Sequence, residues 1–168
     1  TIGMMGSNLG IPDIQDVAEA NRLCDDLGID SISTGSVIGW AMECYEKGIL
    51  TKKDTDGLEM TWGNVEAARA MLRKTALRQG FGAVLAEGLL EAGQRLGRGA
   101  EKYIEHIKGH SIVYDPRLRR LGTMEFEQIT TPRGAHVSAA GSPSYEPGRP
   151  PSDFARHGER MGIPPEAI

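Results

Sequence analysis

The chain has 168 residues and a net charge of −4, from 19 basic and 23 acidic residues that are interspersed along the sequence. This balance creates no field that would attract a phosphate backbone or an anionic bilayer, and no stretch approaches the ~20 apolar residues of a membrane span, so neither nucleic acid nor a membrane is an expected partner. Aromatic residues make up only 5% of the chain, while glycine contributes 22 residues, so packing must depend on small and aliphatic side chains in short helices.

The first two predicted helices lie in the N-terminal third. Residues 12–27 carry an apolar stripe of about 3.6-residue period that Gly28 ends, and the stripe consists of Ile14, Val17, Ala18, Leu23, Cys24 and Leu27. A second helix is expected to begin near Ser36 and to end at Gly48, a residue suited to a left-handed cap. A loop over residues 50–63 follows.

Three further helices are predicted before residue 110. Asn64 is a suitable N-cap for an amphipathic helix that ends near Gly80. The next helix covers 83–96, and Gly88 within it is expected to let another helix approach closely. A short helix over 100–108 ends this part of the chain. The pattern predicts a mainly α fold with a helical domain over residues 1–112.

The character of the sequence changes after Gly109. Turn residues dominate up to Ser152 and no regular element is predicted there, and loops of that length are usually functional or disordered. Ser152 then caps a last predicted helix over 153–161. We expect residues 113–168 to be part of a second, loop-rich domain. Because the chain opens on Thr1 in mid-pattern, we also expect it to be a piece of a longer polypeptide.

Acidic residues are concentrated where the first predicted helix ends, in the stretch CDDLGID at 24–30. Asp25 falls in the last turn and Asp30 just beyond it, and an acidic side chain at a helix C-terminus costs about 0.3–1 kcal/mol. If the two carboxylates converge, they can accept hydrogen bonds from a nitrogen-rich ring such as a pterin or guanine. A solvated helix end with aspartates that favour the turn explains the same residues, so local sequence leaves both interpretations open.

Other motifs give weaker signals. The stretch SISTGS at 31–36 is expected to precede the second helix, where it could bind an anion or simply cap the helix. There is no GxxxxGK[ST] motif, which excludes a P-loop. Cys24 and Cys44 form no CxxC pair, so neither a zinc site nor a disulfide is predicted, and a reducing cytoplasm is the simplest location.

The four histidines differ in what they suggest. His106 and His110 are four residues apart, but Gly109 is expected to end the helix between them, so no metal site is predicted. His136 lies near Arg133 in a loop rich in small residues, where a large ligand can approach the backbone, and we treat it as a candidate site residue. His157 belongs to the last predicted helix and is expected to face solvent.

Nine stretches, taken in order, resemble one family, the tungsten-containing aldehyde ferredoxin oxidoreductases. Relatives of that family include the catalytic subunit of tungsten-dependent benzoyl-coenzyme A reductase. The stretches are GSNLGI (6–11), DDLGIDSISTG (25–35), AMECYEKGIL (41–50), WGN (62–64), GFGAVLAEG (80–88), GRGAEKY (97–103), HIKG (106–109), YDPR (114–117) and TPRGAHV (131–137).

The resemblance implies roles for particular residues. Members carry a DxxGL(C/D) motif that hydrogen-bonds one of two pyranopterins holding the tungsten. Here the motif would comprise Asp25, Gly28, Ile29 in the leucine place, and Asp30, which makes these four the expected cofactor-binding residues. His136 is the nearest match to a histidine that members place near the metal. Some relatives have one more residue before this histidine, and in that register Val137 takes its column.

The activity implied for the intact enzyme is oxidation of a small aldehyde to a carboxylic acid. Electrons would leave the tungsten bis-pyranopterin (a molybdopterin-type cofactor) through a 4Fe–4S cluster to ferredoxin or another electron-carrier subunit. The family's CxxCxxxC run and its second DxxGL(C/D) motif are missing from this sequence. The isolated chain is therefore expected to hold no cofactor and to be inactive without the rest of the polypeptide. The alternatives are a non-catalytic helical interaction module and a benzoyl-coenzyme A reductase-like enzyme.

Overall fold

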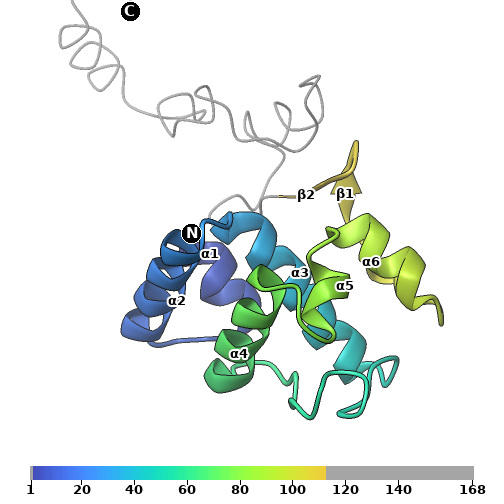
Figure 1. Cartoon of the computed structure of the whole chain (residues 1–168), viewed down its shortest axis with the longest axis horizontal. Coiled ribbons are helices and arrows are strands. Elements are labelled where there is room, and N and C mark those ends of the chain that lie inside the picture. Colours follow the sequence, from blue (N-terminus) through green and yellow to red (C-terminus); the bar gives the residue numbers. More distant parts are fainter. Residues whose placement is uncertain (1, 113–168) are drawn as a thin grey trace, which may run out of the picture.

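Helix α3 (Ser31–Glu46) runs through the middle of the computed structural model, which describes residues 2–112 (Figure 1). Segments from both ends of the described chain contact it, among them α1, α2, α4 and α6. Because neighbours cover it on several sides, α3 is apolar nearly all round, as expected for a central helix. Its buried residues are Thr34, Gly35, Val37, Ile38, Gly39, Trp40, Ala41, Met42 and Cys44.

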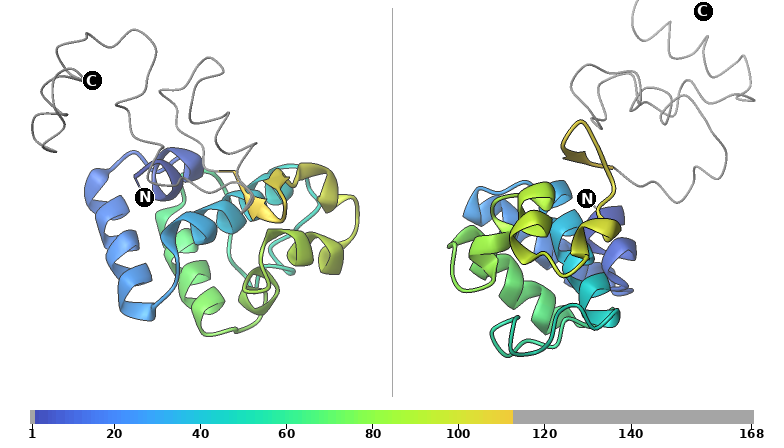
Figure 2. Two further views of the ribbon diagram at one scale, coloured as in Figure 1. Left: turned by 90° about the horizontal axis from the view of Figure 1, so that it is seen from above. Right: turned by 90° about the vertical axis from the view of Figure 1, so that its right-hand side faces the viewer.

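The other elements surround α3 in a mostly helical arrangement, which confirms the mainly α fold class. Helices α2 and α4 lie side by side (Figure 2). The elements besides α3 are α1 (Ile2–Met5), the 3-10 helix η1 (Ser7–Leu9), α2 (Ile14–Leu27), α4 (Val65–Ala76), α5 (Gly82–Leu85), α6 (Leu89–Leu96), the 3-10 helix η2 (Ala100–Tyr103), and the strands β1 (His106–Ile107) and β2 (His110–Ser111).

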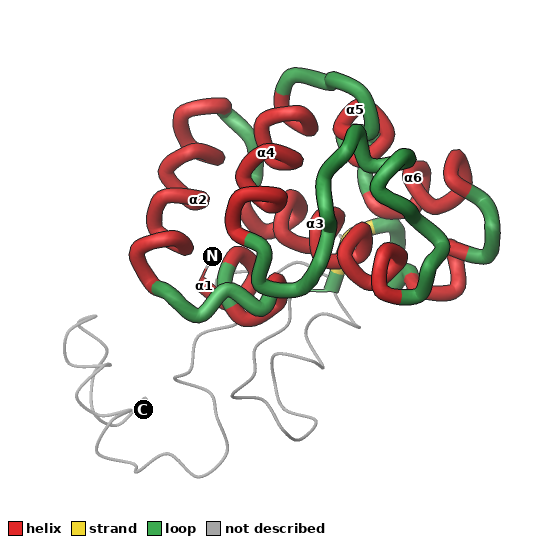
Figure 3. The backbone as a smooth tube through the Cα atoms, turned by 90° about the horizontal axis from the view of Figure 1, so that it is seen from below, coloured by secondary structure: helices red, strands yellow, loops and turns green. Residues whose placement is uncertain are grey.

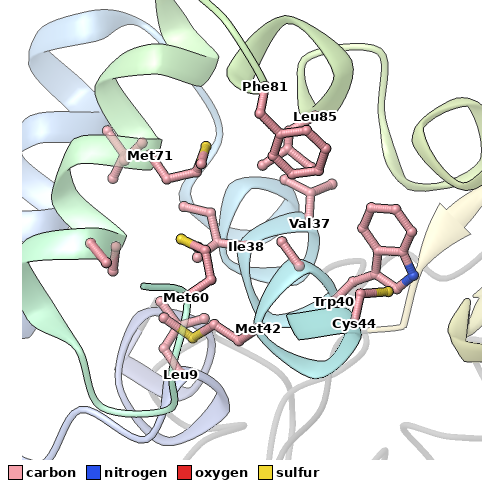
Figure 4. Packing of buried hydrophobic residues seen from close by; sticks show 14 of the residues in the cluster. Leu9, Val37, Ile38, Trp40, Met42, Cys44, Met60, Met71, Phe81 and Leu85 are labelled. Atoms are coloured by element: carbon pink, nitrogen blue, oxygen red, sulfur yellow. The ribbon is translucent and has the colours of Figure 1, made fainter. Parts of the chain in front are cut away.

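The hydrophobic core forms where α3 meets the surrounding helices (Figure 4). On one side of α3, Val37 lies against Phe81 and Leu85 of the α5 region. On another, Ile38 lies near Met71 of α4 and Met60 of the preceding loop. Methionine side chains adapt to irregular gaps, so they can fill a core that contains few aromatic residues.

Two glycines let α1 and η1 approach α3 closely. A Cβ at Gly35 would lie 2.6 Å from the Met4 carbonyl oxygen, and one at Gly39 would lie 2.6 Å from Asn8 Nδ2. Asn8 Nδ2 donates a hydrogen bond to the Gly35 carbonyl at 3.0 Å. Any larger side chain at either glycine would push these segments apart. Neither α1 nor η1 was predicted from the sequence.

Helix α3 begins at Ser31, so the prediction of a start near Ser36 was wrong. Asp30 is the N-cap, and its carboxylate accepts a hydrogen bond from the Ser33 backbone N–H at 2.6 Å. The stretch SISTGS therefore lies inside the helix and does not precede it. Its small residues serve helix packing at Thr34 and Gly35, which are buried.

The helix predicted over 83–96 is two helices, α5 and α6. Gly88 separates them with φ 90° and ψ 168°, a conformation that ends helical hydrogen bonding. No atom lies within 4 Å of the position of a Cβ at Gly88, so the expected close helix approach is wrong for this residue. Gly93 is the closely packed glycine of α6, because a Cβ there would overlap the side chain of Ile104, which directly follows η2.

The prediction of a helix over 100–108 was wrong beyond Tyr103, where the 3-10 helix η2 ends. Strands β1 and β2 pair as an antiparallel hairpin in which Ile107 lies opposite His110. Lys108 and Gly109 have φ of 53° and 91°, as a two-residue hairpin turn with the strands' own twist requires. His106 pairs with Ser111, so His106 and His110 lie on opposite faces of the hairpin.

A long loop over residues 47–64 joins α3 to α4, and its position agrees with the loop predicted over 50–63 (Figure 3). The loop contributes buried side chains to the core at Leu50, Thr55 and Met60. The predicted domain 113–168 and its helix over 153–161 lie outside the described residues. Among residues 2–112, no helix has the length and apolar character needed to cross a bilayer.

Candidate functional site

The turn between α2 and α3 carries the stretch that the sequence singled out, and local backbone bonds determine its shape. Gly28 has φ 68° and ψ 32°, the left-handed conformation. Its N–H donates to the Asp25 carbonyl at 3.2 Å, and the Ile29 N–H donates to the Cys24 carbonyl at 3.0 Å. This pair of bonds is the Schellman pattern of a helix C-terminus. The prediction that Gly28 ends this helix is confirmed.

The acidic residues of this turn are in different electrostatic positions. Asp30 caps the N-terminus of α3, where a carboxylate is favourable. Asp26, in the last turn of α2, pairs with Arg22 at 3.8 Å, but both side chains are exposed and such a pair contributes little. The unfavourable interaction of an acid with a helix C-terminus therefore concerns Asp25 and Asp26, and not Asp30.

Asp25 is exposed and keeps most of its hydrogen-bonding capacity. Its Oδ2 accepts one bond, from Asn21 Nδ2 at 3.2 Å, and no cation among residues 2–112 pairs with it. An ionised carboxylate has about four lone-pair sites. Asp25 therefore presents several unused acceptor sites at a position that the fold does not require to be acidic.

Asp25 and Asp30 lie near the same buried thiol. Burial, and then the charges of Asp25 and Asp30, raise the pKa of Cys24 to about 11. Cys24 is therefore protonated at neutral pH and is not a candidate metal ligand. Both carboxylates raise the pKa of this thiol, so each lies within electrostatic range of Cys24.

Ile29 extends this site towards the interior. It is half-buried and lines a cavity of about 250 Å³, together with Ser33, Thr34, Val37, Thr75, Ala76, Arg78, Leu85, Ala86 and Gly88. At Gly28 no atom lies within 4 Å of the position of a Cβ, so the turn is open on that side. Asp25 and Asp30 do not line this cavity, so Ile29 is the residue that the turn and the cavity share. The acceptor-only carboxylates beside the open turn suit the edge of a flat ring that carries N–H donors.

A second cavity, of about 290 Å³, was not anticipated from the sequence. We call it the Trp40 cavity, and it is lined by Met4, Asn8, Ser36, Gly39, Trp40, Glu43, Trp62, Leu89, Tyr103, Glu105, Ser111 and Ile112. These residues come from segments more than 100 positions apart in the chain, so no local pattern could have found them.

The remaining candidate residues could not be placed. His136 and the alternative Val137 lie outside the described residues, as does His157. Within residues 2–112, no cluster of three or more histidine, cysteine or acidic side chains is arranged to hold a metal ion.

Comparisons with known proteins identify the family. The family model described as aldehyde ferredoxin oxidoreductase, domains 2 and 3, matches residues 1–164. The tungsten-containing aldehyde ferredoxin oxidoreductase of Pyrococcus furiosus is 40% identical over 118 residues, which cover 70% of this chain and 19% of that protein. The aliphatic sulfonate oxidoreductase WOR-like subunit of the same organism is 38% identical over 112 residues, covering 64% of this chain and 18% of that protein.

A solved structure is also similar. It is the active-site complex BamBC of benzoyl-coenzyme A reductase with 1,5-dienoyl-CoA, at 35% identity and a TM-score of 0.55, covering 60% of this chain and 15% of that chain. The chain thus spans about a fifth of the length of the curated relatives it matches, with 19% coverage of the first. Because the family model covers almost every residue, the chain belongs to the aldehyde ferredoxin oxidoreductase family of oxidoreductases.

Proposed function

We propose that the intact protein is a tungstopterin oxidoreductase and that this chain forms one wall of the cofactor site. The names of the relatives support tungsten as the metal. The observation that carries the proposal is the exposed Asp25 carboxylate, which accepts one hydrogen bond although it lies at an unfavourable helix end. Its acceptor sites are free for a ligand.

The residues at the α2–α3 turn fit a pyranopterin in their chemistry. The ring system carries amino and ring N–H donors, and Asp25 and Asp30 supply acceptor-only carboxylates for them. Gly28 leaves the turn open, and half-buried Ile29 holds it against the core. When bound, the tungstopterin supplies the two-electron redox chemistry, and the protein supplies binding and orientation.

The reaction we propose is oxidation of a small aldehyde to a carboxylic acid, with electrons passing through a 4Fe–4S cluster to ferredoxin or another electron-carrier subunit. Such an oxidation takes its added oxygen from one water molecule and releases two protons together with the two electrons. We assign their handling to His136, since an imidazole has an ordinary pKa near neutrality. In this proposal residues 1–112 are the helical middle domain and 113–168 begin the last domain. The enzyme would work in the cytoplasm, and the isolated chain would be inactive.

A second candidate is reduction of an aromatic thioester. The similarity to the benzoyl-coenzyme A reductase complex favours it. Turnover assays of the intact protein with an aldehyde and with benzoyl-coenzyme A separate the two reactions. A non-catalytic interaction module would show neither activity and would contain no tungsten.

The decisive experiment removes the Asp25 carboxylate from the intact protein. Asp25→Ala is expected to lower tungsten and pterin content by about tenfold or more, as loss of a supporting contact typically does to metal affinity. Asp26→Ala is the matched control, because Asp26 is the exposed neighbour whose carboxylate pairs with Arg22. Elemental analysis and pterin fluorescence give the two contents. Equal tungsten content in both variants would contradict the pterin role of Asp25.

The proton-handling role needs a separate variant. His136→Asn should lower turnover by about 10²-fold or more while tungsten content stays unchanged, since general acid–base catalysis contributes on that scale. Full activity in this variant, with Val137→Ala also fully active, would contradict a role of position 136 or 137 in proton transfer.

A further inference from the structure

The cavity of about 250 Å³ that Ile29 lines has both apolar and polar walls, and we call it the Ile29 cavity. Val37 and Leu85, which lie against each other in the core, belong to its apolar part (Figure 4). Arg78 is its one charged lining residue within segment 2–112. The hydroxyl residues in its lining are Ser33, Thr34 and Thr75. A small cavity of this composition suits a compact ligand with an apolar body and a hydrogen-bond-accepting end.

Thr34 contributes a hydroxyl that the described part of the fold does not use, although the residue is only 6% exposed. A threonine hydroxyl within a helix commonly donates to the carbonyl four residues earlier, and Thr75 does so, to Met71 at 2.8 Å. The Thr34 backbone N–H donates to the Asp30 carbonyl at 3.0 Å, but its hydroxyl bonds to no other residue of 2–112. Because a buried hydroxyl without a partner is unfavourable, an acceptor in the cavity would stabilise this one.

Arg78 brings a positive charge to the same cavity. It follows the C-cap of α4 with φ 52°, at a position where glycine is usually favoured. Its guanidinium pairs with Glu87, and Arg95 approaches the same carboxylate at 3.9 Å. One carboxylate therefore faces two guanidinium groups, and Arg78 keeps N–H donors for a further acceptor. The Asp30 carboxylate caps α3, where the helix dipole offsets its charge.

We propose that the Ile29 cavity binds a short-chain carboxylate. The Thr34 hydroxyl and the Arg78 guanidinium donate to the carboxylate, because a guanidinium presents N–H donors that match its geometry. The hydrocarbon part of the ligand lies against Val37 and Leu85. Inorganic phosphate carries a similar charge but has no apolar part, so it suits these walls less well. A carboxylate is also the product class of the oxidation proposed above, and this link alone rests on the proposed function.

The test measures the dissociation constant of butyrate with the intact protein, by saturation-transfer difference NMR. Thr34→Val removes the hydroxyl and keeps the side-chain shape, and it should weaken butyrate binding about five- to tenfold, as loss of one hydrogen bond does. Thr75→Val is the matched control, because Thr75 lines the same cavity but already donates its hydroxyl proton to Met71. This variant should bind butyrate within about twofold of wild type.

A second pair of variants tests the charge. Arg78→Gln should weaken butyrate binding about tenfold or more, because a hydrogen bond between two charged groups is stronger than a neutral one. Arg95→Gln is its control, since Arg95 approaches the same Glu87 carboxylate but does not line the cavity. Its effect should stay within about twofold, as solvent screens an exposed charge.

Stability gives an independent readout of the two threonines. Thr75→Val should lower the midpoint of urea unfolding, because the bond to the Met71 carbonyl is lost. Thr34→Val should leave the midpoint unchanged or raise it, since it removes a buried hydroxyl that bonds to no residue of 2–112. Equal lowering in both variants would give the Thr34 hydroxyl a partner in the fold and overturn the proposal.

Asp25→Ala separates this site from the cofactor. The variant is expected to lose tungsten, but Asp25 does not line the Ile29 cavity, so its butyrate affinity should equal that of wild type. Butyrate binding that disappears together with the tungsten would overturn the proposal, since the cofactor would then hold the ligand. Absence of saturable butyrate binding to wild type would overturn it too, as would tighter binding of inorganic phosphate or equal affinity in Thr34→Val and Thr75→Val.

Discussion

Two helix–helix turns among residues 2–112 each contain a glycine with positive φ, but they differ in how the fold uses the aspartate beside that glycine. The α2–α3 turn contains Gly28 with φ 68°, and the α4–α5 turn contains Gly80 with φ 52°. At the α4–α5 turn, Asp56 of the long loop accepts a hydrogen bond from the Phe81 N–H at 2.9 Å and pairs with Lys74 at 3.2 Å. At the α2–α3 turn, Asp25 accepts one bond from its own helix.

The difference separates a structural aspartate from a candidate ligand-binding one. Asp56 satisfies a backbone donor and a lysine at a turn that is packed so closely that a Cβ at Gly80 would overlap it. Its presence needs no ligand. Asp25 satisfies no distant group, and the neighbouring Gly28 faces open space. An acid that the fold does not use, at a helix end that disfavours it, calls for an explanation outside the described residues.

The largest difference in stability between the two turns is expected when Gly80 and Gly28 are each replaced by alanine. Gly80→Ala should lower the free energy of unfolding by about 2–4 kcal/mol, because it adds left-handed strain to a clash that displaces Asp56 from the Phe81 N–H. Gly28→Ala should cost only about 1 kcal/mol, since strain acts alone there. Urea unfolding monitored by circular dichroism measures both. Equal losses would mean that the two turns are packed alike.

Substitution of Asp56 and of Asp25 tests the same difference between the two turns. Asp56→Asn should cost roughly 1–3 kcal/mol by weakening the bonds to Phe81 and Lys74. Asp25→Asn should stay within about 0.5 kcal/mol of wild type, as most exposed substitutions do. The same urea titrations apply. A large loss in Asp25→Asn would give Asp25 a structural role and weaken its assignment as a cofactor ligand.

Asp30 is intermediate, because it is both an N-cap and a candidate ligand. Asp30→Ala should cost about 1 kcal/mol through loss of the bond to the Ser33 N–H, whereas Asp30→Ser should recover most of that stability. Thermal unfolding of the two variants tests the cap. If Asp30→Ser keeps stability but the intact protein still loses tungsten, the carboxylate has a binding role beyond capping.

The smallest expected effect concerns Cys24, whose pKa is raised to about 11 by burial and by Asp25 and Asp30. Because Asp25→Asn removes one negative charge, the thiol pKa should fall and alkylation by iodoacetamide at pH 8 should quicken by less than about threefold. Cys44 is the internal control, since burial and Glu43 raise its pKa to about 12. Peptide mass spectrometry separates the two rates. Equal acceleration at both thiols would indicate general loosening of the fold.

Because the cysteine pKa values are raised in the folded state, the stability of the fold should decrease at alkaline pH. A thiol with pKa about 11 in the fold and 9.0 when unfolded holds its proton more tightly in the folded state. Its contribution to stability is therefore complete below pH 9 and is lost as the pH rises towards 11. Cys24→Ala should reduce this alkaline loss of stability, which urea unfolding between pH 8 and pH 10.5 can measure.

The sequence by itself determined the helices whose ends depend on local bonds. Asn64 accepts from the Ala67 N–H at 3.1 Å and begins α4, and Gly28 ends α2, both as predicted. Amphipathic α2 and α4 also show the expected periodic pattern, since each buries one face. Membership of the family could be inferred as well, because the matching motifs are spread along most of the chain. The role of His136 stays a prediction.

Tertiary packing alone decided the parts that sequence reasoning missed. Helix α3 is buried on several sides, so it has no polar face to reveal its start. Its Gly35 and Gly39 lie close to α1 and η1, neither of which was predicted. Gly88 has a positive φ that separates α5 from α6, and Lys108 and Gly109 have positive φ in a hairpin turn where a helix was predicted. The Trp40 cavity exists only because distant segments meet. Local propensity is worth less than 1 kcal/mol per residue, and burial of a side chain in the assembled core outweighs it.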